Sequence, residues 1–509
     1  MFELSKVFLY FLIQQTAVVA FSLARSKALA TFTGAGGYGL IAQATSLVLA
    51  FQVILSAGLG SGFVKLIAEN ASEQAAQARN RIASGMYLLG SITGLVGIVL
   101  TGLFSRSISE WVFNTPDYAN YVLICVFTAF FVFQTLFFQN LFRGLLEWKT
   151  YTLVSILGTG ASLFITVTLI GFFHIDGGIW ALLISQAASF LVAVSFFRFK
   201  IFPRHTVDFW NFLPTHKDFR MLLGHIGPLV ITQILLTLSN LVTRSLVIQQ
   251  LGLEDNGIIQ VSTGISDAYM GLILAILFSF ILPKIASTLS AQPQAARQTQ
   301  NDGLRFSLLI ITPFLVTLLA TREIWIPLLY SRAFLAAQGI LVWQFLGDFF
   351  LVVRRCMNID LVPAQRLKYL VLDSSLYAGG MILLAALLLP QLGVYTVVVA
   401  SLIVNLLLTG LSLIYHHRRM LFRPDRASWT MLIKSGGLLG AGFTAALAIP
   451  HLAWRVAAMG LILLLMVVFL PQRGELEKAW REIIPGLLRQ SRLVFHKSTA
   501  SKKADQPMD

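Results

Sequence analysis

The chain has 509 residues, of which 56% are hydrophobic and only 12% are charged. Soluble domains carry about 25% charged residues, so this composition excludes a water-soluble globular protein and indicates that a bilayer surrounds most of the chain. The net charge of +15 does not indicate nucleic-acid binding, because most basic residues lie in short loops between apolar runs. The two cysteines, Cys125 and Cys356, lie far apart in apolar segments and predict neither a disulfide framework nor a metal site.

A first group of apolar segments begins directly after Lys6. A helix needs about 20 apolar residues to cross the hydrocarbon core. No small-residue cleavage site follows the first run, so we expect a first span rather than a removed signal peptide. On this criterion six spans are predicted at 7–30, 38–66, 83–104, 119–141, 151–173 and 178–197.

A second group of spans follows a basic connector at 198–220. Six of these spans are predicted at 221–251, 257–286, 305–321, 337–359, 369–390 and 393–416. Another basic connector, His416 to Arg426, precedes two final spans at 430–449 and 452–470. The tail after Pro471 has apolar side chains on one helical face with Arg and Lys around them, which predicts an interfacial helix, and residues 498–509 are predicted to be disordered.

The expected fold is an all-α polytopic membrane protein with about fourteen transmembrane helices, arranged as two pseudo-symmetric six-helix bundles plus two C-terminal helices. The expected divisions are an N-terminal bundle at 1–197, the connector at 198–220, a C-terminal bundle at 221–416, a basic loop with the last two helices at 417–470, and a basic cytoplasmic tail at 471–509.

The distribution of positive charge predicts the orientation. If the N-terminus is cytoplasmic, 30 of the 38 Lys and Arg residues fall on the cytoplasmic side and six on the other side, while Arg244 and Lys434 fall inside spans. Cytoplasmic loops of membrane proteins are enriched in Lys and Arg, so we expect both termini in the cytoplasm.

An internal repeat is the next expectation. A shift of about 219 residues superimposes Arg25-Ser26 on Arg244-Ser245, Lys65 on Lys284 and Lys149 on Lys368, and brings Gly39 and Gln43 close to Gly257 and Gln260. Because each half holds six spans, the halves share one orientation, and we expect a symmetry axis along the membrane normal with the substrate site between them. The alternative is a chance alignment of charged span ends.

Three basic residues are candidates for binding an anion inside the membrane. Arg25 and Arg244 occupy equivalent outer parts of the first and seventh spans, and Lys27 follows Arg25 closely. Guanidinium groups bind phosphate oxygens in bidentate fashion, so this pair would suit a phosphate-bearing substrate. The alternative is that these side chains extend to the outer membrane interface.

Two aspartates are candidates for ion coupling. Asp267 is predicted near the bilayer centre, and Asp348 shares a helical face with Gln344 and Arg355. A carboxylate in the membrane can alternate between protonated and charged forms, as ion-coupled transport requires. The alternative is a structural ion pair, for example Asp267 with Arg244. For Arg354 and Arg355, attraction to anionic lipid headgroups is a sufficient explanation.

Several segments resemble one transporter family. The first half contains Gly36-Gly37-Tyr38-Gly39, Gln43, Gly58-Leu59-Gly60 and Lys65 in that order. The second half contains Arg244, Gly257-Ile258-Ile259-Gln260, Ile265-Ser266-Asp267-Ala268-Tyr269, Leu282-Pro283, Ile324-Trp325, Phe334 and Trp343-Gln344-Phe345-Leu346-Gly347-Asp348. Over residues 1–416 this order resembles Wzx-type lipid-linked oligosaccharide flippases, most of all those of enterobacterial common antigen and O-antigen units.

The resemblance implies the multidrug/oligosaccharidyl-lipid/polysaccharide (MOP) fold, in which two six-helix bundles surround a central cavity as in MATE transporters. It also implies the substrate, an undecaprenyl-diphosphate-linked sugar repeat moved to the periplasmic leaflet of the bacterial inner membrane. The two extra spans are instead similar to those of peptidoglycan lipid II flippases, so the choice between these substrates stays open. We expect the substrate cavity to contain Arg25, Lys27, Lys65, Arg244, Gln43, Gln260 and Gln344.

The expected mechanism is alternating access without bond chemistry, so no catalytic group, metal or cofactor is expected, and a proton or sodium gradient would act through Asp267 and Asp348. Expected partners are the lipid-linked glycan, membrane lipids, a polysaccharide polymerase and a chain-length regulator, with no nucleic acid.

One alternative function is that of a drug or cation antiporter of the same fold, although the cavity of such an antiporter would favour carboxylates over arginines. A polyprenyl-dependent glycosyltransferase, polymerase or ligase is a second rival, but the longest outer loops, 105–118 and 322–336, are short and lack paired acids. A scaffold without transport activity would explain the intramembrane charges poorly.

Overall fold

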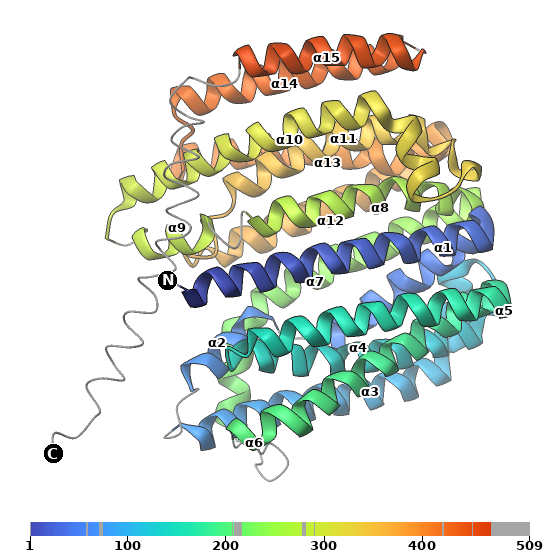
Figure 1. The fold of residues 1–509 in the computed structure, drawn as a ribbon, viewed down its shortest axis with the longest axis vertical. Coiled ribbons are helices and arrows are strands. Elements are labelled where there is room, and N and C mark those ends of the chain that lie inside the picture. Colours follow the sequence, from blue (N-terminus) through green and yellow to red (C-terminus); the bar gives the residue numbers. More distant parts are fainter. Residues whose placement is uncertain are drawn as a thin grey trace.

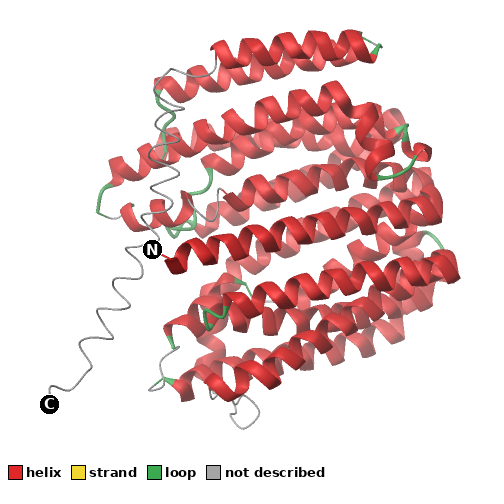
Figure 2. Cartoon of the chain, in the orientation of Figure 1, coloured by secondary structure: helices red, strands yellow, loops and turns green. Residues whose placement is uncertain are grey.

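The computed structural model describes residues 2–56, 60–70, 75–205, 207, 216–276, 281–289, 291–419, 422–449 and 451–469. Within these ranges every long element is a helix and no strand occurs (Figure 2). The predicted tail at 471–509, including its interfacial helix, lies outside the described residues.

The first half of the chain consists of long helices joined by short turns (Figure 1). These elements are α1 (Phe2–Leu55), α2 (Ser61–Glu69), α3 (Ala76–Phe113), η1 (Pro116–Tyr118), α4 (Ala119–Gly144), α5 (Trp148–Phe196), η2 (Phe197–Ile201) and α6 (Phe202–His205).

The second half of the chain also consists of helices, and it ends in a helical hairpin. Its elements are α7 (His216–Leu251), α8 (Leu253–Ile276), α9 (Leu282–Thr288), α10 (Pro293–Leu329), η4 (Arg332–Phe334), α11 (Ala337–Met357), α12 (Leu367–Leu392), η5 (Gly393–Tyr395), α13 (Thr396–Arg419), α14 (Arg426–Ala448) and α15 (Leu452–Phe469). In Figure 1 the first half forms the lower part of the molecule, and α14 and α15 lie at the top, above α10.

Eight helical segments in the described residues are long and apolar enough to cross a membrane. Three of them have 43, 57 and 52 residues, more than twice the length that one span needs. Each of these three contains a residue with left-handed backbone: Gly34 in α1, His174 in α5, and Gly393 between α12 and α13. Helices α8 and α11 are not among the eight.

One predicted span has the wrong boundaries. The span predicted at 38–66 is divided, since α1 ends at Leu55 and the short α2 begins at Ser61. The span predicted at 257–286 holds α8, described to Ile276, and the short α9, and residues 277–280 between them lie outside the described residues. A hydropathy window does not detect the end of α1, because it averages over the short glycine-rich sequence that follows Leu55.

Left-handed residues recur at matching places in the two halves. Gly34 corresponds to Gly252, Leu146 to Gln365, and His174 to Gly393, each pair 218 or 219 residues apart. Leu146 and His174 are not glycines, and a side chain makes this backbone conformation unfavourable, so chance repetition is a poor explanation. The same turns therefore follow corresponding helices in each half.

The two halves meet where α1 crosses α8 at a pair of glycines. A Cβ atom on Gly39 would lie 1.9 Å from the Leu253 carbonyl oxygen, and one on Gly257 would lie 2.1 Å from the Ala35 carbonyl oxygen. The Asn256 amide also donates to the Gly39 carbonyl at 2.8 Å. Only glycine at both positions permits this approach of the two backbones.

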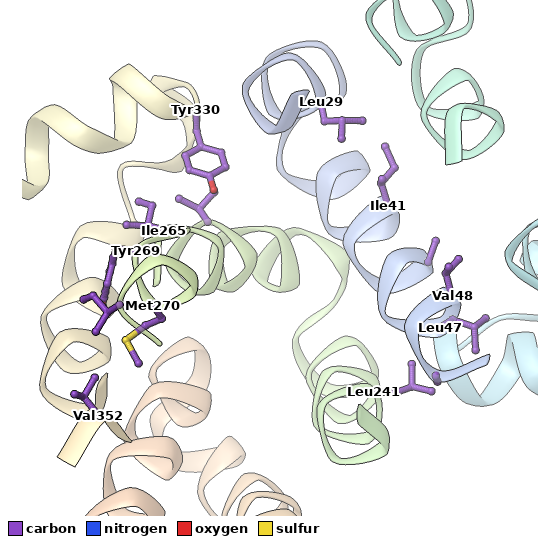
Figure 3. Packing of buried hydrophobic residues seen from close by; sticks show 14 of the residues in the cluster. Leu29, Ile41, Leu47, Val48, Leu241, Ile265, Tyr269, Met270, Tyr330 and Val352 are labelled. Atoms are coloured by element: carbon purple, nitrogen blue, oxygen red, sulfur yellow. The ribbon is translucent and has the colours of Figure 1, made fainter. Parts of the chain in front are cut away.

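Buried apolar side chains continue across this contact. One cluster includes Leu29 and Ile41 of α1 as well as Ile265 and Tyr269 of α8, and Figure 3 shows these two groups on the facing helices. The cluster therefore joins the two halves of the chain into one packed body.

The final hairpin packs on α10 through a buried ion pair. The fully buried Arg455 of α15 donates to Glu323 at 2.6 Å and to the Ala320 carbonyl at 3.3 Å. At the other end of α10, Asn301 accepts from the Asp425 amide and donates to the Arg423 carbonyl. These contacts attach α14 and α15 to the second half at both ends of α10.

Candidate functional site

A pocket of about 450 Å³ lies entirely within the second half. Helices α7, α8, α11, α12 and α13 supply its walls. Its charged lining residues are Arg244, Asp267, Asp348, Arg354 and Arg355. A cavity of this size and charge is suited to a polar ligand.

Arg244 is held rigidly in this pocket by neutral partners. Its Nε donates to Asn240 at 2.9 Å, Nη1 to Asn256 at 3.4 Å, and Nη2 to Thr263 at 3.1 Å. Arginine has five N–H donors, so one hydrogen on each Nη remains unused by these contacts. Within the described ranges, no carboxylate lies within 4.0 Å of this guanidinium, which is only 6% exposed. Arg244 is therefore a preorganised cation with two free donors.

Asp348 is the most strongly bonded acid in the pocket. Its carboxylate accepts from Ser266 at 2.6 Å, from Gln344 at 2.8 Å, and from the hydroxyl of Tyr269. It is only 2% exposed. These three donors compensate for the loss of water around the Asp348 carboxylate. The predicted shared helical face of Gln344, Asp348 and Arg355 is confirmed, because all three residues line the pocket.

Asp267 faces the interior of the same pocket and remains exposed there. It interacts electrostatically with Arg244 but forms no ion pair with it within 4.0 Å. The alternative of a close structural pair between these two residues is therefore wrong for this conformation.

A second pocket, of about 290 Å³, lies in the first half between α1, α4 and α5. Arg25 is its one charged lining residue and donates through Nη1 to Ser162 at 3.1 Å. The remaining polar lining consists of uncharged hydroxyl and amide groups, including Gln14, Gln139 and Gln186. Arg25 and Arg244 thus line two different pockets, one in each half of the described chain.

The other predicted basic residues lie outside both pockets. Lys27 donates to the Leu328 carbonyl at 2.7 Å, and this contact joins α1 to the end of α10. Lys65 is exposed on α2 and pairs with Glu69 at 3.7 Å.

The two remaining glutamines also differ from expectation. Gln43 is fully buried and donates to the Val112 carbonyl and to Ser245, so it joins α1 to α3 and α7. Gln260 lies on α8 near Gly264 and is not among the residues that line the second-half pocket.

The hydrogen bonds between the halves cluster at one face of the molecule. Among the described residues they join Lys27 to Leu328, Gln43 to Ser245, Gln249 to Trp111, and Asn256 to Gly39. All four lie toward the face opposite the N-terminus, where Tyr38 also packs against Tyr330 and Phe334 at 5.9 and 5.7 Å between ring centroids. The halves are therefore closed against each other at this face.

Comparison with known proteins decides the family. The family model described as "Polysaccharide biosynthesis protein" matches residues 28–338, which is more than half of the chain. The chain belongs to the polysaccharide biosynthesis protein family. The resemblance to polysaccharide transporters that the sequence predicts is thereby confirmed.

Two similar proteins are named Lipid III flippase, one from Escherichia coli (strain K12) and one from Shigella flexneri. Each is 23% identical over 353 residues, which cover 68% of this chain and 82% of the relative. Their name, Lipid III flippase, describes a transporter of a lipid rather than an enzyme.

Solved structures show the same fold. Lipid II flippase MurJ in an inward closed conformation superimposes with a TM-score of 0.66 at 16% identity, covering 91% of this chain and 97% of that one. An inward-facing multidrug resistance MATE transporter of the MOP superfamily gives 0.64 at 16% identity, covering 80% and 94%. This polysaccharide biosynthesis protein is therefore an all-α, multi-pass membrane protein with the fold of MATE transporters and MurJ.

Three partners of the site charges were not predicted. Asn240 precedes Arg244 by one helical turn, so helical spacing could have indicated it. Asn256 and Thr263 come from the next helix, and only tertiary structure brings them to Arg244.

Proposed function

We propose that this chain is a flippase that moves undecaprenyl-diphosphate-linked oligosaccharide repeat units from the cytoplasmic to the periplasmic leaflet of the bacterial inner membrane. Membership of the polysaccharide biosynthesis protein family and the similarity to proteins named Lipid III flippase support this proposal. The reaction forms and breaks no covalent bond, so the protein must supply only binding and movement.

The observation that carries the proposal is that the buried Arg244 guanidinium contacts no carboxylate among the described residues. Burying such a charge costs free energy unless a bound anion neutralises it. Its two free hydrogens, one on each Nη, match the bidentate geometry that phosphate oxygens accept. A diphosphate headgroup provides such oxygens, whereas a cationic drug would be repelled.

The pocket in the first half supports binding of the sugar part. Hydroxyl and amide side chains can both donate and accept hydrogen bonds, as saccharide hydroxyls require. We assign the saccharide to this pocket and the diphosphate to the pocket around Arg244. The polyprenyl chain then stays in the surrounding lipid.

We further propose fourteen spans, with bundles at 1–197 and 221–416 and a hairpin within 417–470. Dividing the three overlong segments at Gly34, His174 and Gly393 gives the lengths that single spans need, and the repeated left-handed residues support the two equivalent bundles. The excess of Lys and Arg on one side supports cytoplasmic termini. With that orientation, the closed face is periplasmic and the described conformation faces inward.

Proton or sodium movement through Asp267 and Asp348 is the proposed driving force. Both carboxylates line the pocket that holds Arg244, so an ion bound there would change the charge that the headgroup meets. The polymerase and the chain-length regulator expected as partners would act on the exported product.

Reconstituted vesicles test the function. The lipid-linked oligosaccharide carries a fluorophore on its sugar, and a membrane-impermeant reductant bleaches the outer-leaflet molecules. Wild-type protein should make nearly all of the lipid accessible to the reductant, and bleaching no greater than in protein-free vesicles would refute the function. Vesicles with Arg244→Ala should show no more bleaching than protein-free vesicles. Vesicles with Arg106→Ala should bleach as the wild type does, because Arg106 is exposed and lies outside the pocket.

A further inference from the structure

Two adjacent arginines lie at the far end of the Arg244 pocket. Arg354 and Arg355 end helix α11, and both line the cavity. Gln344, near the middle of α11, lines it as well, so the cavity extends over about 16 Å of this helix at 1.5 Å per residue. Arg244 lies toward the closed face, whereas Arg355 lies toward the face that carries the N-terminus.

The first of these arginines is already neutralised. Arg354 is 2% exposed, and its Nη1 donates to Asp373 at 3.0 Å. Its guanidinium also lies 5.0 Å from the centroid of the Tyr377 ring. Asn358 donates to the second oxygen of the same carboxylate at 3.5 Å.

The second arginine has no such partner in the described part of the chain. The Nε of Arg355 is buried without a hydrogen-bond partner, and no carboxylate lies within 4.0 Å of its guanidinium. Its electrostatic neighbours are Arg354, which repels it, and Asp373, which Arg354 already binds. Two guanidiniums thus share one carboxylate, and one positive charge at the pocket wall is left uncompensated.

We propose that Arg355 is a second anion-binding residue of this pocket, which receives the diphosphate of the lipid-linked substrate at the cytoplasmic end before it reaches Arg244. The inference rests on the proposed function for the identity of the ligand. The two carboxylates that line this pocket, Asp267 and Asp348, lie beyond 4.0 Å of the Arg355 guanidinium, so a bound anion would compensate its charge. Phosphate oxygens are the acceptors that guanidinium donors fit best. Attraction of Arg355 to lipid headgroups at the membrane surface, which is a sufficient explanation from the sequence alone, does not account for its place in the pocket wall.

Direct binding tests this assignment on the full-length protein in phosphatidylcholine nanodiscs. The probes are undecaprenyl diphosphate, inorganic pyrophosphate and phosphatidylglycerol, and the variants are Arg355→Gln, Arg355→Lys and Arg418→Gln. Arg418 is an exposed arginine toward the same face that does not line this pocket, so it controls for general loss of positive charge.

We expect Arg355→Gln to weaken undecaprenyl diphosphate and pyrophosphate binding about tenfold, as loss of one charge-assisted contact does, and Arg418→Gln to leave both unchanged. Arg355→Lys should retain part of the affinity, because the charge remains. Affinity should also fall less steeply with salt for Arg355→Gln than for wild type, which a purely structural role of Arg355 would not produce.

Three results would overturn the proposal. Wild-type affinity in Arg355→Gln would remove Arg355 as a ligand and leave the flippase function intact. An equal loss of phosphatidylglycerol binding would show that Arg355 contacts bulk phospholipid rather than the diphosphate of the substrate. Failure of wild-type protein to bind either diphosphate would refute the flippase proposal together with this one.

Discussion

At the scale of single residues, the proposed diphosphate site depends on which basic residue occupies position 244. Arg244→Lys keeps the positive charge but replaces a planar fork, fixed by Asn240, Asn256 and Thr263, with a mobile ammonium group. We expect about tenfold weaker binding of undecaprenyl diphosphate, equivalent to about 1.4 kcal/mol, measured in nanodiscs. Equal affinities of the lysine variant and the wild type would show that geometry at this position is unimportant.

Asp360, in the loop between α11 and α12, makes stability depend on pH. Burial raises the pKa of Asp360 to about 6, and His416 Nδ1 lies 3.9 Å from its carboxylate. Because the folded protein holds this proton more tightly than the unfolded chain, the stability it contributes is complete below about pH 4 and is lost as the pH rises through about 6.

Asp360→Asn removes this loss. The variant should exceed the wild type in stability at pH 8 by about 2–3 kcal/mol, since each unit of pKa shift corresponds to about 1.4 kcal/mol. The advantage should disappear near pH 4, and melting temperatures at both values measure it. A difference that does not change with pH would contradict the explanation.

The contact between α1 and α8 decides, at the scale of elements, whether the halves can close. Gly39→Ala places a methyl group 1.9 Å from the Leu253 carbonyl oxygen, so these helices must separate. Gly36→Ala is a matched control, because its Cβ would have no atom within 4 Å. Spin labels on the exposed residues Phe32 and Glu254 should report longer distances in Gly39→Ala than in the wild type and in Gly36→Ala. Unchanged distances in Gly39→Ala would show that this crossing does not hold the face closed.

The proposed ion coupling belongs to the scale of the whole molecule, because it requires the charged pocket to respond to both sides of the membrane. A potential that is negative inside opposes headgroup export by about 2.3 kcal/mol per charge per 100 mV. In vesicles, an imposed proton gradient should accelerate flipping by the wild type severalfold. Asp267→Asn and Asp348→Asn should lose this response, whereas Asp117→Asn, exposed and remote from the pocket, should retain it. A retained response in both pocket variants would exclude these carboxylates as ion carriers.

The architecture was more predictable from sequence than the site. Hydropathy locates the helices because each apolar run must satisfy its own backbone in lipid, yet it misses the end of α1 at Leu55. Helical spacing predicts the Gln344–Asp348 contact, which is local. Helical spacing cannot reveal that the Gln43 amide forms hydrogen bonds to other helices or that Arg355 lines a cavity, since both depend on how separate helices pack.

A cryo-electron microscopy map of the purified protein with an undecaprenyl-diphosphate-linked trisaccharide is the most direct measurement. We expect phosphate density within about 3 Å of the Arg244 guanidinium, inside the pocket formed by α7, α8 and α11. Phosphate density on the outer surface of the helices, with this pocket empty, would contradict the assignment of the diphosphate site.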